Sequence, residues 1–422
     1  MSAALKTTAL DATAQAFLTR YAGLRARLPG SHDARDAAAT RLRASGLPGP
    51  REEAWRFTHL RPITEFTFLE PLTPIEDCPR LLARLPEIDA PRLVFVDGRY
   101  RPDLSTPPEG IAVRVGGPAG EAVLAGEKLV DLNTMLGEDG AEIVVADGVD
   151  AGTLVLASLA TDRDARHGAF HPRHAVSLGK GAKLTLIDVA LGEGVYLNNS
   201  VLAIRVAEHA HLTHLRMQLE SIRAFSFATL FADIAEGGEY DSFTLTIGAR
   251  LSRNEVHANL SGPNAIAHLN AARMLRGQQH GDFTSIIRHI APNCQSNQTV
   301  KTVLDNAARG VFQGKIEVAR GAQKTDGYQM NQALLLSHDA EMNSKPQLEI
   351  YADDVKCSHG ATVGEIDAEQ LFYLRSRGVA HEEARAMLIR AFLAEAINGI
   401  SHEAGRAAME TCLDAWWGAD AA

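Results

Sequence analysis

Short strands that recur at a nearly constant interval between residues 151 and 362 constrain the fold more than any other feature of this chain. Three segments of that region, 183–189, 211–219 and 240–247, alternate polar and apolar residues, which is typical of β-strands. Turn-forming residues lie 28, 29, 26, 29 and 28 residues apart, at Gly181, His209, Gly238, Asn264, Asn293 and Gly321. A fixed period in this range is typical of a solenoid, in which each coil buries its apolar face only by stacking on its neighbours. We therefore predict a mainly β fold with a parallel β-helix core. A β-sandwich is the alternative, since it also needs many short strands.

Helical patterns dominate the first part of the chain. One apolar stripe at helical spacing consists of Phe17, Tyr21, Leu24 and Leu28. A second helix is predicted to begin after Ser31, a favoured N-cap residue, and to end at Gly46. The segment 51–60 is amphipathic and rich in aromatic residues, and we interpret it as a helix that docks Trp55 and Phe57 into its own domain.

Helical patterns return after the strands. Asp367, followed three residues later by Gln370, resembles a capping box, and Gly378 marks the end of that helix. The next helix carries a predicted apolar stripe made of Ala384, Met387, Leu388, Ala391 and Phe392. We therefore divide the chain into an N-terminal helical and mixed domain (1–150), a β-helix core (151–362) and a C-terminal helical domain (363–422).

Composition excludes several classes of function. The formal charge of −10 and the pI near 5.9 argue against a nucleic-acid-binding protein, because no basic run offers a surface to phosphates. The N-terminus lacks a secretory signal and no run of about 18 apolar residues exists, so we expect a cytoplasmic protein. We expect no disulfides among the four widely spaced cysteines, Cys78, Cys294, Cys357 and Cys412.

Cys357 and His359 are the strongest candidates for chemistry. They lie two residues apart, so an extended backbone would place both side chains on one face. A neighbouring imidazolium lowers the pKa of a thiol and makes it a better nucleophile or soft-metal ligand. The alternative is a structural pair, a half-buried cysteine beside a solvated histidine in a turn.

Two further histidine groups are predicted to be structural. One group is His167, His171 and His174. Gly168 and Pro172 interrupt it, so the rings cannot share one helix face, and we interpret the group as a polar lead-in to the first strand. The other group is His209, His211 and His214, which we expect at the surface of a strand.

No nucleotide-binding loop is found in the sequence. The glycines at positions 310 and 314 precede Lys315, but their spacing is too short for a phosphate-binding loop and Ile316 follows instead of Ser or Thr. If the protein uses ATP, another subunit must bind it.

The chain resembles the SufB/SufD family of the SUF iron–sulfur cluster assembly system. The most specific segment is Asp353-Asp-Val-Lys-Cys-Ser-His-Gly-Ala-Thr-Val-Gly364, followed by Glu369-Gln-Leu-Phe-Tyr-Leu-Arg-Ser-Arg-Gly378. Similar segments are 343–346, 347–350, 171–173 with 181–185, and 52–58. The resemblance implies a right-handed parallel β-helix between helical segments. It also implies a non-catalytic scaffold subunit that pairs with SufB and binds the ABC-type ATPase SufC.

Two departures place the resemblance in the SufD branch of the family. The strand expected at 328–336 has no cysteine, whereas SufB carries a sulfur-accepting cysteine on the matching strand. Cys357-Ser-His359-Gly360 stands where SufB has a Glu-His-Glu-type motif. The sulfur-acceptor role is therefore not carried over to this chain. The alternatives are the SufB branch itself and a β-helical carbohydrate-active enzyme, which would be secreted.

The resemblance also implies roles for individual residues. His359, as an iron ligand or proton carrier, and Cys357, as a thiolate exposed on rearrangement, would help to hold a transient Fe–S cluster or iron shared with SufB. Helices that dock on SufC would carry Gln370, Phe372, Tyr373, Met387, Leu388 and Phe392. ATP hydrolysis in SufC would then lever the two β-helices against each other. Flavin binding, homodimerisation, the cluster type and the sulfur donor stay open at this stage.

Overall fold

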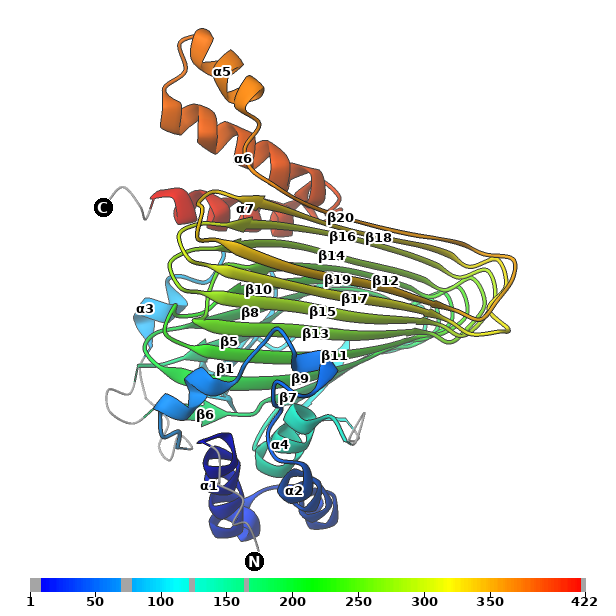
Figure 1. Cartoon of the computed structure of the whole chain (residues 1–422). Helices are drawn as coiled ribbons and strands as arrows, with labels where there is room; N and C mark the ends of the chain where they lie inside the picture. Colours follow the sequence, from blue (N-terminus) through cyan, green and yellow to red (C-terminus); the bar gives the residue numbers. More distant parts are fainter. Residues whose placement is uncertain (1–8, 70–77, 121–125, 163–166, 419–422) are drawn as a thin grey trace, which may run out of the picture.

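The computed structural model describes residues 9–69, 78–120, 126–162 and 167–418, whose core is a parallel β-solenoid (Figure 1). Each coil contributes one strand to each of two facing sheets, and successive strands of a sheet pair in parallel. This confirms the predicted β-helix. The parallel pairing sets the β-sandwich aside, because sandwiches are built from antiparallel sheets.

The strands fall into two sheets. Sheet I contains, in spatial order, β2 (Arg99–Tyr100), β1 (Arg92–Val96), β5 (Asp150–Ala160), β8 (Lys183–Gly192), β10 (His211–Leu219), β12 (Glu239–Thr246), β14 (Ile266–Leu275), β16 (Gln295–Leu304), β18 (Asp326–Leu335) and β20 (Lys356–Gly364). Sheet II contains β19 (Glu341–Ile350), β17 (Arg309–Val318), β15 (His280–His289), β13 (Leu251–Leu260), β11 (Phe225–Ile234), β9 (Tyr196–Val206), β7 (Arg173–Leu178), β4 (Ala141–Val145) and β3 (Ile111–Val115), with β6 (Gly168–Phe170) beside β9.

The sequence period has a backbone cause. One corner of each coil contains a residue in the left-handed region, with φ between 55° and 65°, at Gly181, His209, Gly237, Asn264, Asn293 and Lys324. Glycine reaches this region without steric cost and asparagine reaches it more readily than most residues. Four of the six turn markers read from the sequence are these corner residues. The other two miss, because the corner lies at Gly237 rather than Gly238 and at Lys324 rather than Gly321.

Apolar side chains fill three layers. The inner layer lies between the sheets and includes Leu186, Leu212 and Phe312. The helices α1 (Ala9–Leu24), α2 (His32–Ser45) and α4 (Lys128–Leu136) pack against the outer face of sheet II. The outer face of sheet I is covered by α3 (Pro79–Leu82), α6 (His381–Ile397) and α7 (Glu403–Gly418). The short helix α5 (Ala368–Ser376) stands away from the solenoid in Figure 1.

Capping residues in the sequence predicted several helix ends correctly. The Ser31 hydroxyl accepts a hydrogen bond from the amide of Ala34 at the start of α2, and Gly46 has a φ of 66° at its end. Asp367 caps α5 by accepting from the amides of Glu369 and Gln370. Capping residues determine these ends because they satisfy backbone groups that the helix leaves unpaired.

Two helical predictions are wrong. The segment 51–60 forms only a 3₁₀ turn, Glu53–Trp55, and Trp55 packs on the solenoid, where the Arg253 guanidinium lies 4.2 Å from its ring centroid. The stripe predicted for α6 is not its buried face, because Met387 is 45% exposed. The face that packs on sheet I instead consists of Ala384, Ile389, Leu393, Ala396 and Ile397.

Candidate functional site

The two ends of the solenoid differ in whether a further strand covers the sheet edges. At the N-terminal end the antiparallel strands β2 and β3 close sheets I and II. At the other end β20 and β19 are the last strands of their sheets, and within the described residues no further strand pairs with either. We call the end formed by β19 and β20 the open end. Parallel strands are usually covered, and an unpaired edge offers a row of free backbone hydrogen-bonding groups to another chain.

Exposed apolar side chains mark the same end. Ile350 is 40% exposed, Tyr351 is 61% exposed and Val363 is 48% exposed. Ile350 and Val363 lie on the last strands of the two sheets, where in earlier coils the next coil covers such positions. This combination of free edge and apolar surface is typical of an interface.

Cys357 lies on β20 with its side chain between the sheets. It is paired in register with Gly327 on β18, and it packs against a small apolar cluster that includes Ile316 and Val318 of the opposite sheet. Burial raises the pKa of the thiol, and a backbone hydrogen bond from Gly327 offsets this only in part. The expectation that a neighbouring imidazolium lowers this pKa is therefore wrong for the chain by itself, because desolvation dominates.

His359 follows Cys357 on the same face of β20, as the alternation of an extended strand requires. Its side chain is exposed, since no coil follows to cover it. It is in register with Gln329, whose buried amide donates to Gln298 at 2.9 Å. Cys357 and His359 thus lie together on a strand rather than in a turn. The interior side-chain amides of Gln298 and Gln329 lead up to His359 from the preceding strands of the same sheet.

Of the six histidines in the two groups singled out in the sequence, three are buried, His171, His174 and His214. His171 and His174 are buried, and desolvation lowers their pKa values to about 3 and about 4, so both are neutral. His214 is 1% exposed and lies 3.0 Å from the Tyr240 hydroxyl, so it is not a surface residue. His209 is on a corner rather than a strand. Only His211 is partly exposed on its strand as expected, 2.7 Å from Glu239. No group of three His, Cys, Asp or Glu residues that could hold a metal occurs in the described part of the chain.

The six residues predicted to dock on an ATPase differ in their exposure on the C-terminal helices. Phe372 is 73% exposed and Tyr373 is 57% exposed on α5, which buries none of its side chains. Gln370 and Met387 are also exposed. Leu388 and Phe392 are partly buried instead. The Phe392 ring lies 4.6 Å below the ammonium of Lys301, so this side chain also contributes to the chain's own packing.

Comparisons with known proteins agree with this architecture. The family model of the SufBD core domain, described as SUF system FeS cluster assembly, matches residues 160–392, more than half of the chain. The iron–sulfur cluster assembly protein SufD of Escherichia coli is 36% identical over 86% of this chain and 87% of its own length. An iron–sulfur cluster assembly SufBD family protein of Synechocystis is 30% identical over 90% of this chain and 89% of its own. The chloroplastic protein ABCI7 of Arabidopsis thaliana is 29% identical over 86% of this chain and 81% of its own.

The chain belongs to the SufBD family. Within that family it is a SufD-type iron–sulfur cluster assembly protein, and it has a role in the SUF system. The match favours cluster assembly over the carbohydrate-active alternative. None of the helices within the described ranges combines the length and the apolar character that crossing a membrane requires.

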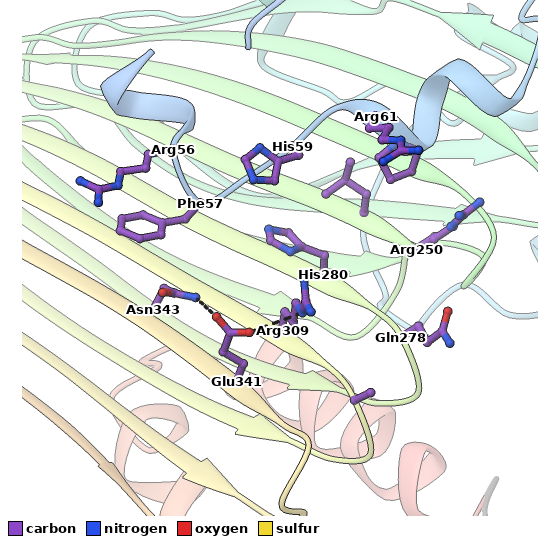
Figure 2. A pocket seen from close by; sticks show the side chains of 13 residues that line it. Arg56, Phe57, His59, Arg61, Arg250, Gln278, His280, Arg309, Glu341 and Asn343 are labelled. Carbon is purple, nitrogen blue, oxygen red and sulfur yellow. Dashed lines mark hydrogen bonds and ion pairs between the residues drawn. The ribbon is translucent and has the colours of Figure 1, made fainter. Parts of the chain in front are cut away.

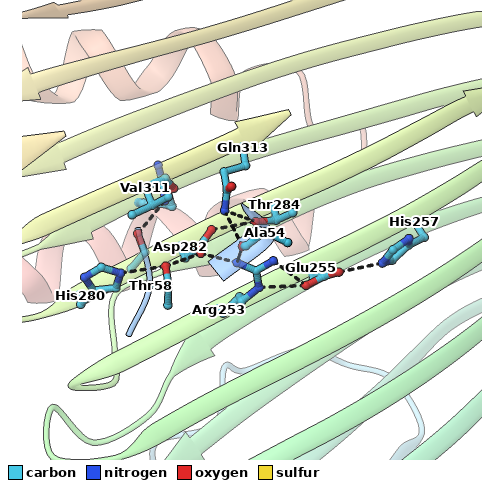
Figure 3. Close-up of polar contacts among 12 residues, drawn as sticks. Ala54, Thr58, Arg253, Glu255, His257, His280, Asp282, Thr284, Val311 and Gln313 are labelled. Carbon is cyan, nitrogen blue, oxygen red and sulfur yellow. Dashed lines mark hydrogen bonds and ion pairs between the residues drawn. The ribbon is translucent and has the colours of Figure 1, made fainter. Parts of the chain in front are cut away.

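Sequence reasoning missed a buried charged network in this SufBD protein (Figure 3). The Arg253 guanidinium donates to Asp282 at 2.6 Å and to Glu255 at 2.9 Å, and His257 lies 2.9 Å from the other oxygen of Glu255. Burial alone would raise the pKa of Glu255, but Arg253 and His257 together lower it to about 2. Arg253 and Asp282 are paired in register on β13 and β15. Opposite charges one solenoid period apart are therefore the signal that could have revealed them.

The network also holds the N-terminal segment on the solenoid. The Thr58 hydroxyl donates to Asp282, and the Ala54 carbonyl accepts from Arg253 at 2.9 Å and from Gln313 at 3.1 Å. Trp55 is stacked on Arg253 between these two anchors. The segment 54–58 is thereby fixed against sheet II of the SufBD core.

Proposed function

We propose that this chain is a non-catalytic scaffold subunit of the SUF complex, which pairs through its open end with a SufB-type β-helix. A nascent Fe–S cluster would be built between the two. The observation that carries the proposal is the coincidence of two free sheet edges, exposed apolar side chains and the Cys357–His359 pair at one end of the solenoid. A partner β-helix would pair these edges and bury the apolar positions.

The composition of the site supports a shared cluster. Iron in Fe–S clusters is usually held by four protein ligands, mostly thiolates with some histidine. Cys357 and His359 supply two donors, so the partner would supply the others. The raised pKa keeps the Cys357 thiol protonated and unreactive in the free chain. Iron would displace this proton once docking opens the apolar cluster around the thiol.

The C-terminal helices support a link to an ATPase. The exposed aromatic residues of α5 offer a docking surface for a SufC-type subunit, while α6 lies on β14 and β16. Glu395 of α6 forms an ion pair with Lys301 of β16, a lysine that is 1% exposed. A shift of α6 driven by ATP hydrolysis in the partner would act on β16 and, through β18, on β20, where Cys357 and His359 lie.

The pairing is tested by an Ile350→Asp substitution. We expect the wild-type chain, purified anaerobically by affinity from its host, to bring SufB-type and SufC-type chains in stoichiometric amounts. Ile350→Asp should lose the SufB-type chain, because a carboxylate would be buried without a partner in the interface. Ile222→Asp is the matched control, since Ile222 is 64% exposed in a turn away from the open end. Equal recovery of the SufB-type chain with both variants would contradict the proposed interface.

The site is tested by cluster content. In the reconstituted complex, His359→Ala and Cys357→Ser should each weaken cluster retention by about tenfold or more, since changes outside the ligand shell already cost about that much. Iron and sulfide analysis with absorption spectroscopy would measure this. His338→Ala and Cys412→Ser serve as controls, because His338 is fully exposed and Cys412 lies on α7. Unchanged cluster content in both site variants would remove these residues from the mechanism.

A further inference from the structure

A second concave site lies on the outer face of sheet II, apart from Cys357 and His359. It is a cavity of about 570 Å³ between the segment 56–62 and the ends of β13, β15, β17 and β19. In Figure 2, His59 and His280 lie near its centre, with Arg61 and Arg250 on one side, Arg56 on the other and Arg309 below His280. The SufBD core thus supplies the floor and the N-terminal segment supplies the wall.

The cavity carries an excess of positive charge. Four arginines line it, Arg56, Arg61, Arg250 and Arg309. Arg250 is paired with Glu65 at 2.9 Å, and Arg309 lies 3.6 Å from Glu341. Arg56 and Arg61 form no ion pair with any described residue. Among the described residues that line the cavity, Glu341 is the only carboxylate, and it also accepts a hydrogen bond from Asn343 at 2.8 Å.

The wall of the cavity is fixed in place. Thr58, between the two arginines of the segment, is 1% exposed and bonded to both Asp282 and His280. His280 itself lines the cavity, so the buried network reaches the site directly. The backbone that carries Arg56 and Arg61 is therefore held before any ligand arrives, which reduces the entropic cost of binding.

We propose that this cavity binds a phosphate-bearing small molecule. Arginine is the side chain best suited to phosphate, because its planar guanidinium donates two parallel hydrogen bonds and stays charged at all physiological pH values. A volume of about 570 Å³ lies within the range of small-molecule sites. The Phe57 ring, partly exposed at the rim, offers a face on which a nucleobase could stack.

Calorimetric titration of the purified full-length chain with pyrophosphate, AMP and adenosine tests the proposal. We expect pyrophosphate and AMP to bind, adenosine not to bind, and the affinity to fall as salt is raised from 50 to 200 mM. AMP binding tighter than pyrophosphate would identify a nucleotide site, and equal affinity would identify a site for the phosphate group alone. The double variant Arg61→Gln and Arg309→Gln should weaken binding by about a hundredfold, about tenfold for each arginine.

A matched control removes the same charge elsewhere. Arg114→Gln with Arg390→Gln changes two exposed arginines, one on β3 at the other end of sheet II and one on α6, which covers sheet I, and should bind both probes as the wild type does. The cavity variant should also still co-purify with its SufB-type partner, which separates this site from the open end. The proposal is overturned if neither probe binds at millimolar concentration, or if both double variants bind equally. Loss of a protein partner in the cavity variant, without binding of either probe, would assign the surface to that protein instead.

Discussion

Replacing Asp282 by alanine should destabilise the folded chain by about 3 kcal/mol or more, because it removes one partner of a buried ion pair. The Asp282 side chain is fully buried and accepts hydrogen bonds from Arg253, Thr58 and Thr284. Arg253, 2% exposed, would keep Glu255 but lose its closest carboxylate. Thr58 would lose its anchor as well, so the segment 54–58 should open locally.

Urea unfolding followed by circular dichroism measures the first effect, and amide exchange in residues 54–60 measures the second. Asp339→Ala is the control, since this carboxylate is 82% exposed and should change stability by no more than about 0.5 kcal/mol. The triple variant Arg253→Met, Glu255→Gln and Asp282→Leu should recover part of the loss, because neither the guanidinium nor either of its carboxylates is then left without a partner. An Asp282→Ala variant as stable as the wild type would show that the network is not structural.

The protein should lose stability as the pH falls from about 6.5 to 4, a loss that begins well above the ordinary pKa of carboxylates. Burial lowers the pKa of His171 to about 3 and those of His174 and His289 to about 4, against an ordinary value of 6.5. Below pH 6.5 these imidazoles therefore bind protons in the unfolded chain but not in the folded chain, so a lower pH favours unfolding. Across their full windows His174 and His289 each contribute roughly 3 kcal/mol, and His171 contributes roughly 5 kcal/mol.

Carboxylates add a second loss at lower pH. Burial would raise the pKa of Asp188, but Arg216 and His214 lower it to about 2. The stability that Asp188 contributes is present above its ordinary pKa of 3.8 and is lost as the pH falls through about 2. The histidine window thus begins near pH 6.5 and the Asp188 window near pH 3.8, so the two overlap only at the acid end of the histidine window.

Thermal melts between pH 4 and 7.5 measure the histidine window. His289→Gln removes one titrating group that is 0% exposed, and its stability should vary less with pH than that of the wild type, by roughly 3 kcal/mol across the window. His338→Gln should follow the wild-type curve, because that side chain is fully exposed. A melting temperature that stays constant from pH 6.5 to 4.5 would contradict the neutral burial of these histidines.

The fold could be predicted where the backbone itself demands particular residues. Corner positions in the left-handed region favour Gly and Asn, so the coil length appears directly in the sequence at Gly181, Asn264 and Asn293. The corner at Lys324 could not be found this way, because lysine has no preference for that region. The starts of two helices could also be predicted, because the capping side chains of Ser31 and Asp367 bond to backbone amides only two or three residues away.

Features that depend on distant contacts were not predicted. The segment 51–60 has a helical pattern, but anchors on β13, β15 and β17 hold it as a 3₁₀ turn and a loop. Alternation placed Cys357 and His359 on one face, yet only the three-dimensional stacking shows that this face is at an open end and that burial raises the thiol's pKa. The arginine cavity is lined by five separate parts of the chain, and no spacing rule connects them.

Hydrogen exchange of β19 and β20, measured with and without a SufB-type partner, tests the central claim most directly. We expect amides of these two strands to exchange rapidly in the free chain and to be protected strongly on complex formation, with Cys357 and His359 inside the protected segment. Strands β8 and β10, already paired on both sides, should change little. Protection confined to other parts of the chain, with β19 and β20 still exchanging freely in the complex, would contradict an assembly site at the open end.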